Sequence, residues 1–297
     1  MLDYQDFINY MRSEKRMSEN TVIAYGKDLD HFFAFVEEVV QARSLESISS
    51  DDIRVWIISL LEDQGNSTRT VNRKLSTLKS FFRYQLKMGH ITHNPVAAIL
   101  SPKVSKRLPV YVEQNDMERL FSSDLFADDF EGRRDQLVIE LFYATGIRLS
   151  ELLNLHHQDV DLVQNTIKVL GKRNKERIIP FGENVHNLFT NYFDIYRNFF
   201  QPTSENYCIF VAANGKPLYP KAIYRIVRKY LDMVTTIDKR SPHVIRHTFA
   251  THLLNNGADL NAIKTILGHS SLAATQVYTH NSIEQLKSIY KQAHPRA

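Results

Sequence analysis

Apolar residues recur at helical spacing along the first third of the chain. The repeats cover residues 7–11, 22–36, 53–60 and 71–86, and each would place its apolar side chains on one face of a helix. Serine residues, which often cap helices, precede the last three repeats, and Gly89 follows the fourth. We therefore expect four helices in this part of the chain.

The pattern changes between helix and strand after residue 110. TIKVL and ERIIPF have the character of β-strands, and GKRNK between them predicts a hairpin turn that contains Lys172. YCIFV, around Cys208, is a further candidate for a buried strand. Helical spacing returns in residues 113–121, 132–144, 148–155, 185–200, 221–234, 243–255 and 260–267. The predicted fold class is mainly α, with a small antiparallel sheet in the second part.

A break in periodicity separates the two parts. SPKVSKRLPV, residues 101–110, contains two prolines and three basic residues without an apolar repeat, as an interdomain linker would. A chain of 297 residues is also comfortable for two domains. We place a helical domain at residues 1–101, a basic linker at 102–110 and an α-rich domain with the sheet at 111–297.

The net charge of the chain is only +4, so local patches say more about partners than the total does. The predicted fourth helix is apolar on one side, and its other side carries basic residues and no acidic ones. These are Arg69, Arg73, Lys79, Arg83 and Lys87. A solvated helix face would explain them, and so would contact with the phosphates of a nucleic acid. The helix alone leaves both interpretations open.

Compartment can be argued from two further features. A single cysteine, Cys208, cannot form an internal disulfide, which fits a reducing environment. The most apolar stretches, such as VIELFYA at 138–144, are too short to span a bilayer. We therefore expect a cytoplasmic protein without membrane insertion.

Four stretches carry candidate chemistry: ATGIRLSEL (144–152), LGKRNKERIIP (170–180), SPHVIRHTFATHLL (241–254) and LGHSSLAATQVYTH (267–280). The residues of interest in them are Arg148, Lys172, His243, Arg246, His269 and Tyr278. Each has an ordinary structural explanation when taken singly, such as an ion pair, an exposed turn or a backbone hydrogen bond. Their combination is what needs a chemical explanation.

A zinc site is one alternative for the third stretch. His243 and His247 lie four residues apart, a spacing that can hold zinc on one helix face. The zinc-peptidase pattern, however, needs a glutamate beside the first histidine, where this chain has Val244. Arg246 would also place a permanent positive charge beside the metal. We therefore disfavour zinc hydrolysis.

Phosphoryl transfer without a metal suits the combination better. Its transition state spreads negative charge over nonbridging oxygens, which arginine forks bind in pairs of hydrogen bonds. Tyr278 lies among small and polar residues, whereas Tyr25, Tyr143 and Tyr230 fall within helical apolar patterns typical of a core.

The order and context of these motifs resemble the tyrosine recombinases, a phage-integrase-like family, over essentially the whole chain. The helical N-terminal segment and the terminal HPRA are most similar to the Xer branch, which resolves chromosome dimers in bacteria. Arg173 occupies a position where family members often have glycine, so the sequence departs from the family pattern there and the family does not imply the geometry of this turn. The resemblance implies a core-DNA-binding domain followed by a catalytic domain.

The resemblance also implies roles for the residues. Tyr278 would attack the scissile phosphate, forming a 3′-phosphotyrosyl link and releasing a 5′-hydroxyl. A tyrosine has an unperturbed pKa near 10, so His243 would accept its proton. Arg148, Arg246 and His269 would bind the nonbridging oxygens.

Lys172 would protonate the leaving 5′-oxygen, with Glu151 and His247 as supporting residues. The energy of the phosphate bond is kept in the phosphotyrosyl link, so neither ATP nor a metal nor another cofactor is expected.

Assembly follows from the same resemblance. Two protomers would bind a short inverted-repeat site in double-stranded DNA, and a homo- or hetero-tetramer on two sites would exchange strands through a Holliday junction. A short apolar stripe near the C-terminus would form an exchange helix that docks on a neighbouring protomer, or else on its own domain: Ile283, Leu286, Ile289 and Tyr290. A DNA translocase is a further candidate partner.

Three other functions remain as alternatives to chromosome dimer resolution and its roles in chromosome partition and cell division. An integrase of a mobile element would use the same chemistry for DNA integration. A type IB topoisomerase would relax DNA without a partner site. A binding-only architectural factor would use the scaffold alone, although all six catalytic positions hold competent residue types.

Overall fold

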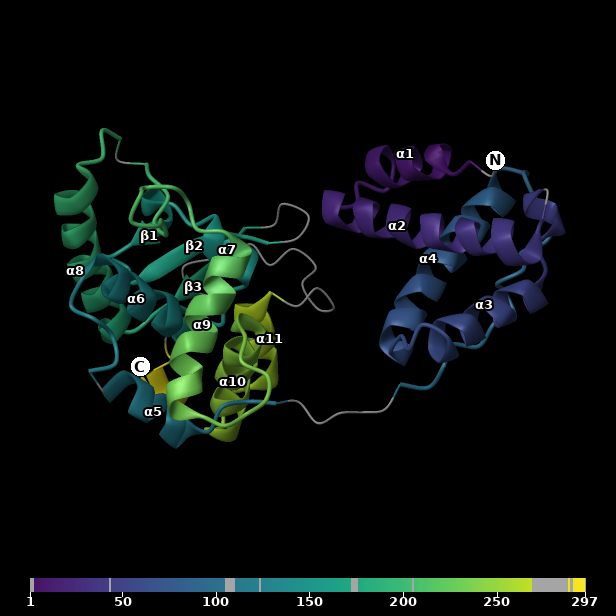
Figure 1. The fold of residues 1–297 in the computed structure, drawn as a ribbon. Helices are drawn as coiled ribbons and strands as arrows, with labels where there is room; N and C mark the ends of the chain where they lie inside the picture. Colours follow the sequence, from purple (N-terminus) through teal and green to yellow (C-terminus); the bar gives the residue numbers. More distant parts are fainter. Residues whose placement is uncertain are drawn as a thin grey trace. The chain divides into compact units, whose positions relative to one another are not determined.

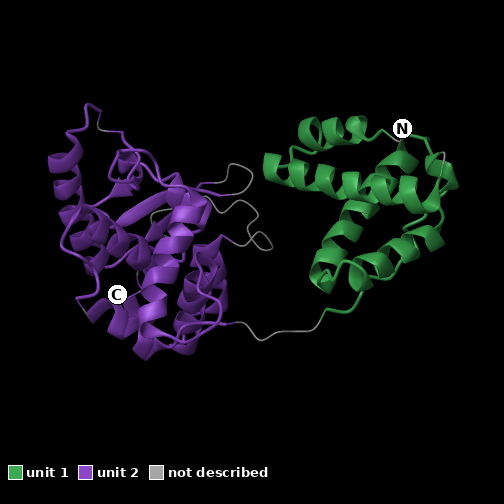
Figure 2. Ribbon diagram, viewed as in Figure 1, with its two compact units in different colours: residues 1–107 green, residues 108–297 purple. Residues whose placement is uncertain are grey.

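The computed structural model describes residues 3–42, 44–104, 110–122, 124–171, 176–204, 206–268, 288 and 291–296. The chain divides into two compact units, residues 1–107 and 108–297 (Figures 1 and 2). The structure is mainly α-helical with a small antiparallel sheet, so the predicted fold class is confirmed.

The first unit consists of helices, as the apolar repeats predict. Its α-helices in the described ranges are α1 (Gln5–Ser13), α2 (Glu19–Phe35), α3 (Ser50–Glu62) and α4 (Thr68–Lys87). The Ser49 and Ser67 hydroxyls accept hydrogen bonds from backbone N–H groups in the first turns of α3 and α4, each at 3.2 Å. Ser18 also lies at an N-cap position, but its hydroxyl contacts the Thr21 hydroxyl instead.

Large aromatic side chains fill the core of this unit. Phe32, Trp56, Phe81 and Phe82 are fully buried, and their rings meet edge to face. The expectation that Leu86 shares this core is wrong, because that side chain is 41% exposed. The buried face of α4 extends through residues such as Lys74 and Gln85, so its centre is rotated away from Leu86.

The second unit combines helices with one sheet. In the described ranges its α-helices include α5 (Gln114–Ser122), α6 (Phe130–Thr145), α7 (Leu149–Leu153), α8 (Glu183–Phe200), α9 (Pro220–Val234), α10 (Pro242–Asn255) and α11 (Leu260–Leu267). Helix α6 is buried along most of its length and packs against α8 and α10 (Figure 1). Such all-round burial explains why its sequence lacks a polar face.

The sheet has the strand order β1-β2-β3, with all pairs antiparallel. Its strands are β1 (Val160–Asp161), β2 (Thr166–Leu170) and β3 (Glu176–Pro180). Ile167 pairs with Ile179, and Leu170 pairs with Glu176 at the end that leads to the turn. The two strands of the predicted hairpin are therefore confirmed, while Lys172 in its turn lies outside the described residues.

The segment around Cys208 differs from the prediction. Cys208 forms an isolated bridge with His156, and no strand of the sheet includes it. Ile209 and Phe210 are nevertheless fully buried. The apolar run thus reflects burial of an irregular segment, because a run this short does not distinguish a strand from other buried backbone.

Hydrogen bonds between side chains and the backbone anchor the chain on either side of residues 105–109, which the structure does not describe. The Asn72 side-chain amide of α4 donates to the carbonyl oxygen of Pro102 at 2.8 Å. In the second unit, the Val112 backbone N–H donates to the Thr248 hydroxyl of α10 at 2.9 Å. None of the helices in the described ranges is long and apolar enough to cross a membrane.

Candidate active site

The turn between α6 and α7 positions Arg148. Gly146 ends α6 in the left-handed conformation, with φ of 59°. A Cβ atom there would lie 2.5 Å from the Phe249 ring and 2.8 Å from Leu267, so glycine is required for both conformation and space. Arg148 follows as the N-cap residue of α7.

One carboxylate fixes both the backbone and the side chain of Arg148. The Arg148 backbone N–H donates to Glu151 Oε2 at 2.8 Å, and its Nη1 donates to Glu151 Oε1 at 2.7 Å. The Glu151 side chain is only 1% exposed. The ion pair between Arg148 and Glu151 is therefore present, and it orients the Arg148 side chain.

Three arginines converge on the last carbonyl groups of α11. Arg148 Nη2 donates to the Gly268 carbonyl at 2.8 Å, and Arg246 Nη2 donates to the Leu267 carbonyl at 2.6 Å. Arg177 Nε donates to the carbonyl of Ile266 at 3.0 Å. Cations are stabilised at this end of a helix by its unpaired carbonyls and dipole. The next residue after Gly268 is His269, which lies outside the described residues.

Sequence analysis missed Arg177. Its Nη1 and Nη2 donate to the two oxygens of Glu151 at 2.5 and 2.8 Å. Burial raises the pKa of Glu151, but hydrogen bonds and charge from Arg177 and then Arg148 outweigh it and lower this pKa to about 2. A signal was present, because strand alternation places Arg177 on the same inward face as Ile179.

Arg246 on α10 is buried, and its Nη1 also donates to the Gly146 carbonyl. Burial lowers its pKa to about 9, with repulsion from Arg148 and Arg177 adding to the effect and Glu151 opposing it. The residue stays charged at neutral pH. Three guanidinium groups beside one carboxylate leave an excess of positive charge, which favours an anion.

Two histidines of α10, His243 and His247, lie within one turn of Arg246. His243 is exposed in its first turn, three residues before Arg246 and therefore on the same face. His247 is half-buried, and burial followed by repulsion from His243 lowers its pKa. The structure thus brings together Arg148 and Arg246, with His243 one turn along α10, whereas Lys172, His269 and Tyr278 lie outside the described residues.

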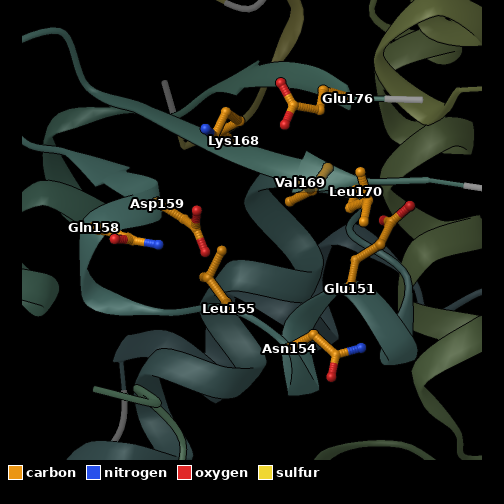
Figure 3. Close-up of a pocket in the computed structure, with 9 residues that line it drawn as sticks. All are labelled: Glu151, Asn154, Leu155, Gln158, Asp159, Lys168, Val169, Leu170 and Glu176. Carbon is orange, nitrogen blue, oxygen red and sulfur yellow. The ribbon is translucent and has the colours of Figure 1, made fainter. Parts of the chain in front are cut away.

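A pocket of 370 Å³ includes Glu151 of this cluster in its lining (Figure 3). Figure 3 shows Glu151 reaching it from α7 and Lys168 from β2. Asp159 and Glu176 add two more carboxylates to the lining. Its excess of negative charge disfavours a phosphate, so the pocket is not suited to the chemistry that the arginines favour.

The last described residues, 291–296, pack against their own unit. His294 is buried, and its Nε2 donates to the Tyr143 carbonyl at 3.1 Å. Arg296 Nε donates to Glu140 Oε1 at 2.6 Å. Outside the described residues lies the predicted apolar stripe of Ile283, Leu286, Ile289 and Tyr290.

The basic side of α4 in the first unit is not uniform. Arg73 pairs with the buried Asp28 of α2, which also accepts a hydrogen bond from the Thr77 hydroxyl at 2.9 Å. The expectation that no acid balances this stripe is therefore wrong for Arg73, because the acid comes from another helix. Arg69, Arg83 and Lys87 are exposed, whereas Lys79 lies between buried and exposed.

A second basic helix face was missed. The exposed side of α9 carries Lys221, Arg225, Arg228 and Lys229, and Asp232 on the same side lies 3.7 Å from Arg228. Lys221, Arg225 and Lys229 recur every four residues in KAIYRIVRK, and Arg228 lies three residues after Arg225, within a helix that the sequence does predict.

Comparison with known proteins follows the same division of the chain. The family model "Phage integrase family" matches residues 111–285, and "Phage integrase, N-terminal SAM-like domain" matches residues 4–89. Tyrosine recombinase XerC of Chlorobaculum parvum is 37% identical over 317 residues, covering 99% of this chain and 94% of that protein. Tyrosine recombinase XerD of Staphylococcus haemolyticus is 36% identical over 295 residues, covering 99% and 98%.

Solved structures share the fold at lower identity. The Tn1549 transposon integrase in complex with circular intermediate DNA superimposes with a TM-score of 0.71 at 22% identity, covering 95% of this chain and 97% of that one. The XerH recombinase bound to palindromic difH substrate also gives 0.71 at 22%, covering 90% and 78%. On the strength of the family models and full-length relatives, the chain belongs to the phage integrase family and is a site-specific DNA recombinase of the Xer tyrosine recombinase type.

Proposed function

We propose that this protein resolves chromosome dimers in the bacterial cytoplasm, by cutting and rejoining DNA through a 3′-phosphotyrosyl intermediate at Tyr278. The observation that carries the proposal is the pairing of Arg148 and Arg246 on consecutive carbonyls at the end of α11. Two guanidinium groups held in this way can bind the nonbridging oxygens of one phosphate. The chain continues from that point directly into His269.

In the proposed cleavage step, the phenolic oxygen of Tyr278 forms a bond to phosphorus while the bond to the 5′-oxygen breaks. The phenolic proton passes to His243, and Lys172 gives a proton to the leaving 5′-oxygen. The reverse reaction, with a 5′-hydroxyl from the partner duplex, completes strand transfer. No cofactor is consumed because each phosphodiester bond is exchanged for another ester bond.

Charge at the phosphate is stabilised by the groups around α11. Arg148 and Arg246 each retain donor groups beyond those used in the contacts described here, because a guanidinium has five N–H groups. His269, which follows Gly268 in the chain, would donate a further hydrogen bond to a nonbridging oxygen. These donors are held before the reaction starts, which is the arrangement that lowers a barrier most.

DNA binding involves both parts of the chain in this proposal. Residues 1–101 form the core-DNA-binding domain, residues 102–110 a basic linker, and residues 111–297 the catalytic domain. The exposed basic residues of α4 contact phosphates, and those of α9 do the same from the catalytic domain. The Tn1549 transposon integrase in complex with circular intermediate DNA has the same fold, which supports DNA as the partner.

Two protomers bind each inverted-repeat site, and two sites form a homo- or hetero-tetramer coupled by exchange of C-terminal helices. A DNA translocase would act on this assembly. The full-length match to XerC and XerD proteins supports the chromosomal role.

Covalent trapping in cells tests the proposal. Cells expressing the wild type or Tyr278→Phe are lysed under denaturing conditions, and DNA attached to the protein is sequenced. Wild-type adducts at one inverted-repeat site near the replication terminus, absent from the variant, are expected. Adducts at the junction of a mobile element would favour an integrase, and retained DNA binding without adducts would favour a binding-only factor.

A further inference from the structure

We infer that Arg177 is a positioning residue for strand cleavage: it holds Arg148 in the orientation that binds the scissile phosphate, and it holds the end of α11 in front of His269. The inference deepens the proposed function and rests on it, because phosphate binding by Arg148 is part of that proposal.

The Arg177 guanidinium uses all three of its nitrogen atoms within the site. Nη1 and Nη2 donate to the two oxygens of Glu151, and Nε donates to the carbonyl of Ile266. The same two oxygens of Glu151 accept from the side chain and the backbone of Arg148. Arg177 therefore reaches Arg148 through one shared carboxylate.

Because Arg148 and Arg177 share the Glu151 carboxylate, Arg148 keeps more of its N–H donors for a phosphate. Because Arg177 occupies both oxygens of Glu151, the Arg148 side chain meets this carboxylate through Nη1 alone in the described contacts. Without Arg177, the buried carboxylate would lack half of its partners and would favour a two-pronged pair with Arg148. Such a pair would draw the Arg148 guanidinium away from the phosphate.

An independent contact links Arg177 to the end of α11. A Cβ atom built on Gly268 would lie 3.2 to 3.3 Å from the Arg177 Cδ, Nε and Cζ atoms. Gly268 has φ of 63°, so both its conformation and this close approach favour glycine. Arg177 thus packs against the residue that immediately precedes His269.

A comparison within the same unit shows that burial alone does not create this arrangement. Arg134 of α6 is also buried, and it pairs with Asp135 and with the carbonyl of Val211. Neither partner contacts Arg148 or Arg246 in the described part of the chain. Arg134 is therefore a matched control for the loss of a buried guanidinium.

The test measures single-turnover formation of the protein–DNA adduct by the full-length chain. The DNA is a short duplex that carries the trapped site, nicked beside the cleavage point so that the cut end is lost. One version has an ordinary scissile phosphate, and the other has a neutral methylphosphonate there. A neutral methylphosphonate gains less from the Arg148 guanidinium than a charged phosphate does. A variant in which Arg148 is misoriented should therefore lose less of the rate of adduct formation on the neutral DNA.

We expect Arg177→Lys to slow adduct formation about 10- to 100-fold on ordinary DNA, as changes behind a ligating residue commonly do. Lysine keeps the charge but cannot bridge Glu151 and Ile266. On methylphosphonate DNA the ratio of wild-type to variant rate should fall to within about threefold of unity. Arg134→Lys should give the same ratio on both DNAs, and thermal unfolding of each variant shows how much fold is lost.

Equal slowing of Arg177→Lys on both DNAs would overturn the inference and assign Arg177 to the fold alone. Unchanged rates on both would overturn it as well, since Arg148 would then be held without Arg177. The wild-type rate and its loss in Tyr278→Phe, measured on the same ordinary DNA, test the proposed function separately.

Discussion

Arg246, beside the end of α11, is both buried and close to two other guanidinium groups. Arg246 is buried deeply enough for its pKa to fall to about 9, with repulsion from Arg148 and Arg177 as further causes. The unpaired carbonyls of α11 make this crowding tolerable, because they lie at the negative end of the helix. An anion bound between the guanidinium groups would relieve the repulsion, so the free site stores the electrostatic strain that phosphate binding removes.

His294 gives a prediction for pH at the same scale. Burial lowers its pKa to about 4, the Tyr143 carbonyl opposes this, and Arg296 and His252 add repulsion. The folded chain therefore leaves His294 neutral between pH 6.5 and 4, where the unfolded chain binds a proton. Stability contributed by this neutral histidine is present above pH 6.5 and is lost as the pH falls toward 4.

We expect the wild type to lose more unfolding free energy between pH 7.5 and 4.5 than His294→Gln does. A fall in pKa from 6.5 to about 4 sets the difference at about 3 kcal/mol at most. Chemical unfolding of both proteins at each pH measures it. His243→Gln, which removes an exposed histidine, should keep the wild-type dependence, and identical curves for all three proteins would contradict the assignment.

At the scale of elements, the turn from α6 to α7 is the most constrained connection of the site. Gly146 reverses the chain where Phe249 of α10 and Leu267 of α11 already fill the space. Arg148 comes two residues later. The turn therefore links the packing of three helices to the orientation of one guanidinium.

Gly146→Ala should destabilise the second unit by about 2 to 5 kcal/mol, from left-handed strain and overpacking together. Gly257→Ala is the matched control, since Gly257 has φ of 86° but nothing within 4 Å of an added Cβ. It should lose only the strain of the left-handed conformation, about 1 to 2 kcal/mol. Unfolding by denaturant compares them, and equal losses would show that Phe249 and Leu267 yield to the added methyl group.

Elements were predictable where periodicity was strong. The helices of both units and the β2–β3 hairpin follow from apolar spacing, and Gly146 and Gly268 mark helix ends. The segment at Cys208 was mistaken for a strand because burial gives the same short apolar run. Arg148 and Arg246 could be named from their motifs. Strand alternation marks Arg177 only as inward-facing, because its role depends on Glu151 and Ile266 from other elements.

At the scale of the whole molecule, basic residues are distributed differently in the two units. The second unit gathers arginines around one helix end, where they share partners, and it also exposes basic residues on α9. The first unit spreads basic residues along the exposed side of α4, with Arg73 excepted by its pair with Asp28. Concentrated charge suits chemistry at one phosphate, and spread charge suits contact with many.

Within α4, Arg73 is paired with Asp28 and Arg83 is exposed, so we expect different effects when each is replaced. Arg83→Gln should weaken binding of the full chain to any DNA sequence and reduce the slope of log affinity against log salt by about 0.9, without loss of stability. Arg73→Gln should instead lower the unfolding temperature, because the buried Asp28 loses an ion-pair partner. Titrations at several salt concentrations and thermal unfolding of both variants separate these effects. An unchanged slope for Arg83→Gln would mean that its side of α4 is a solvated face, and the first unit would then have to hold DNA through other residues.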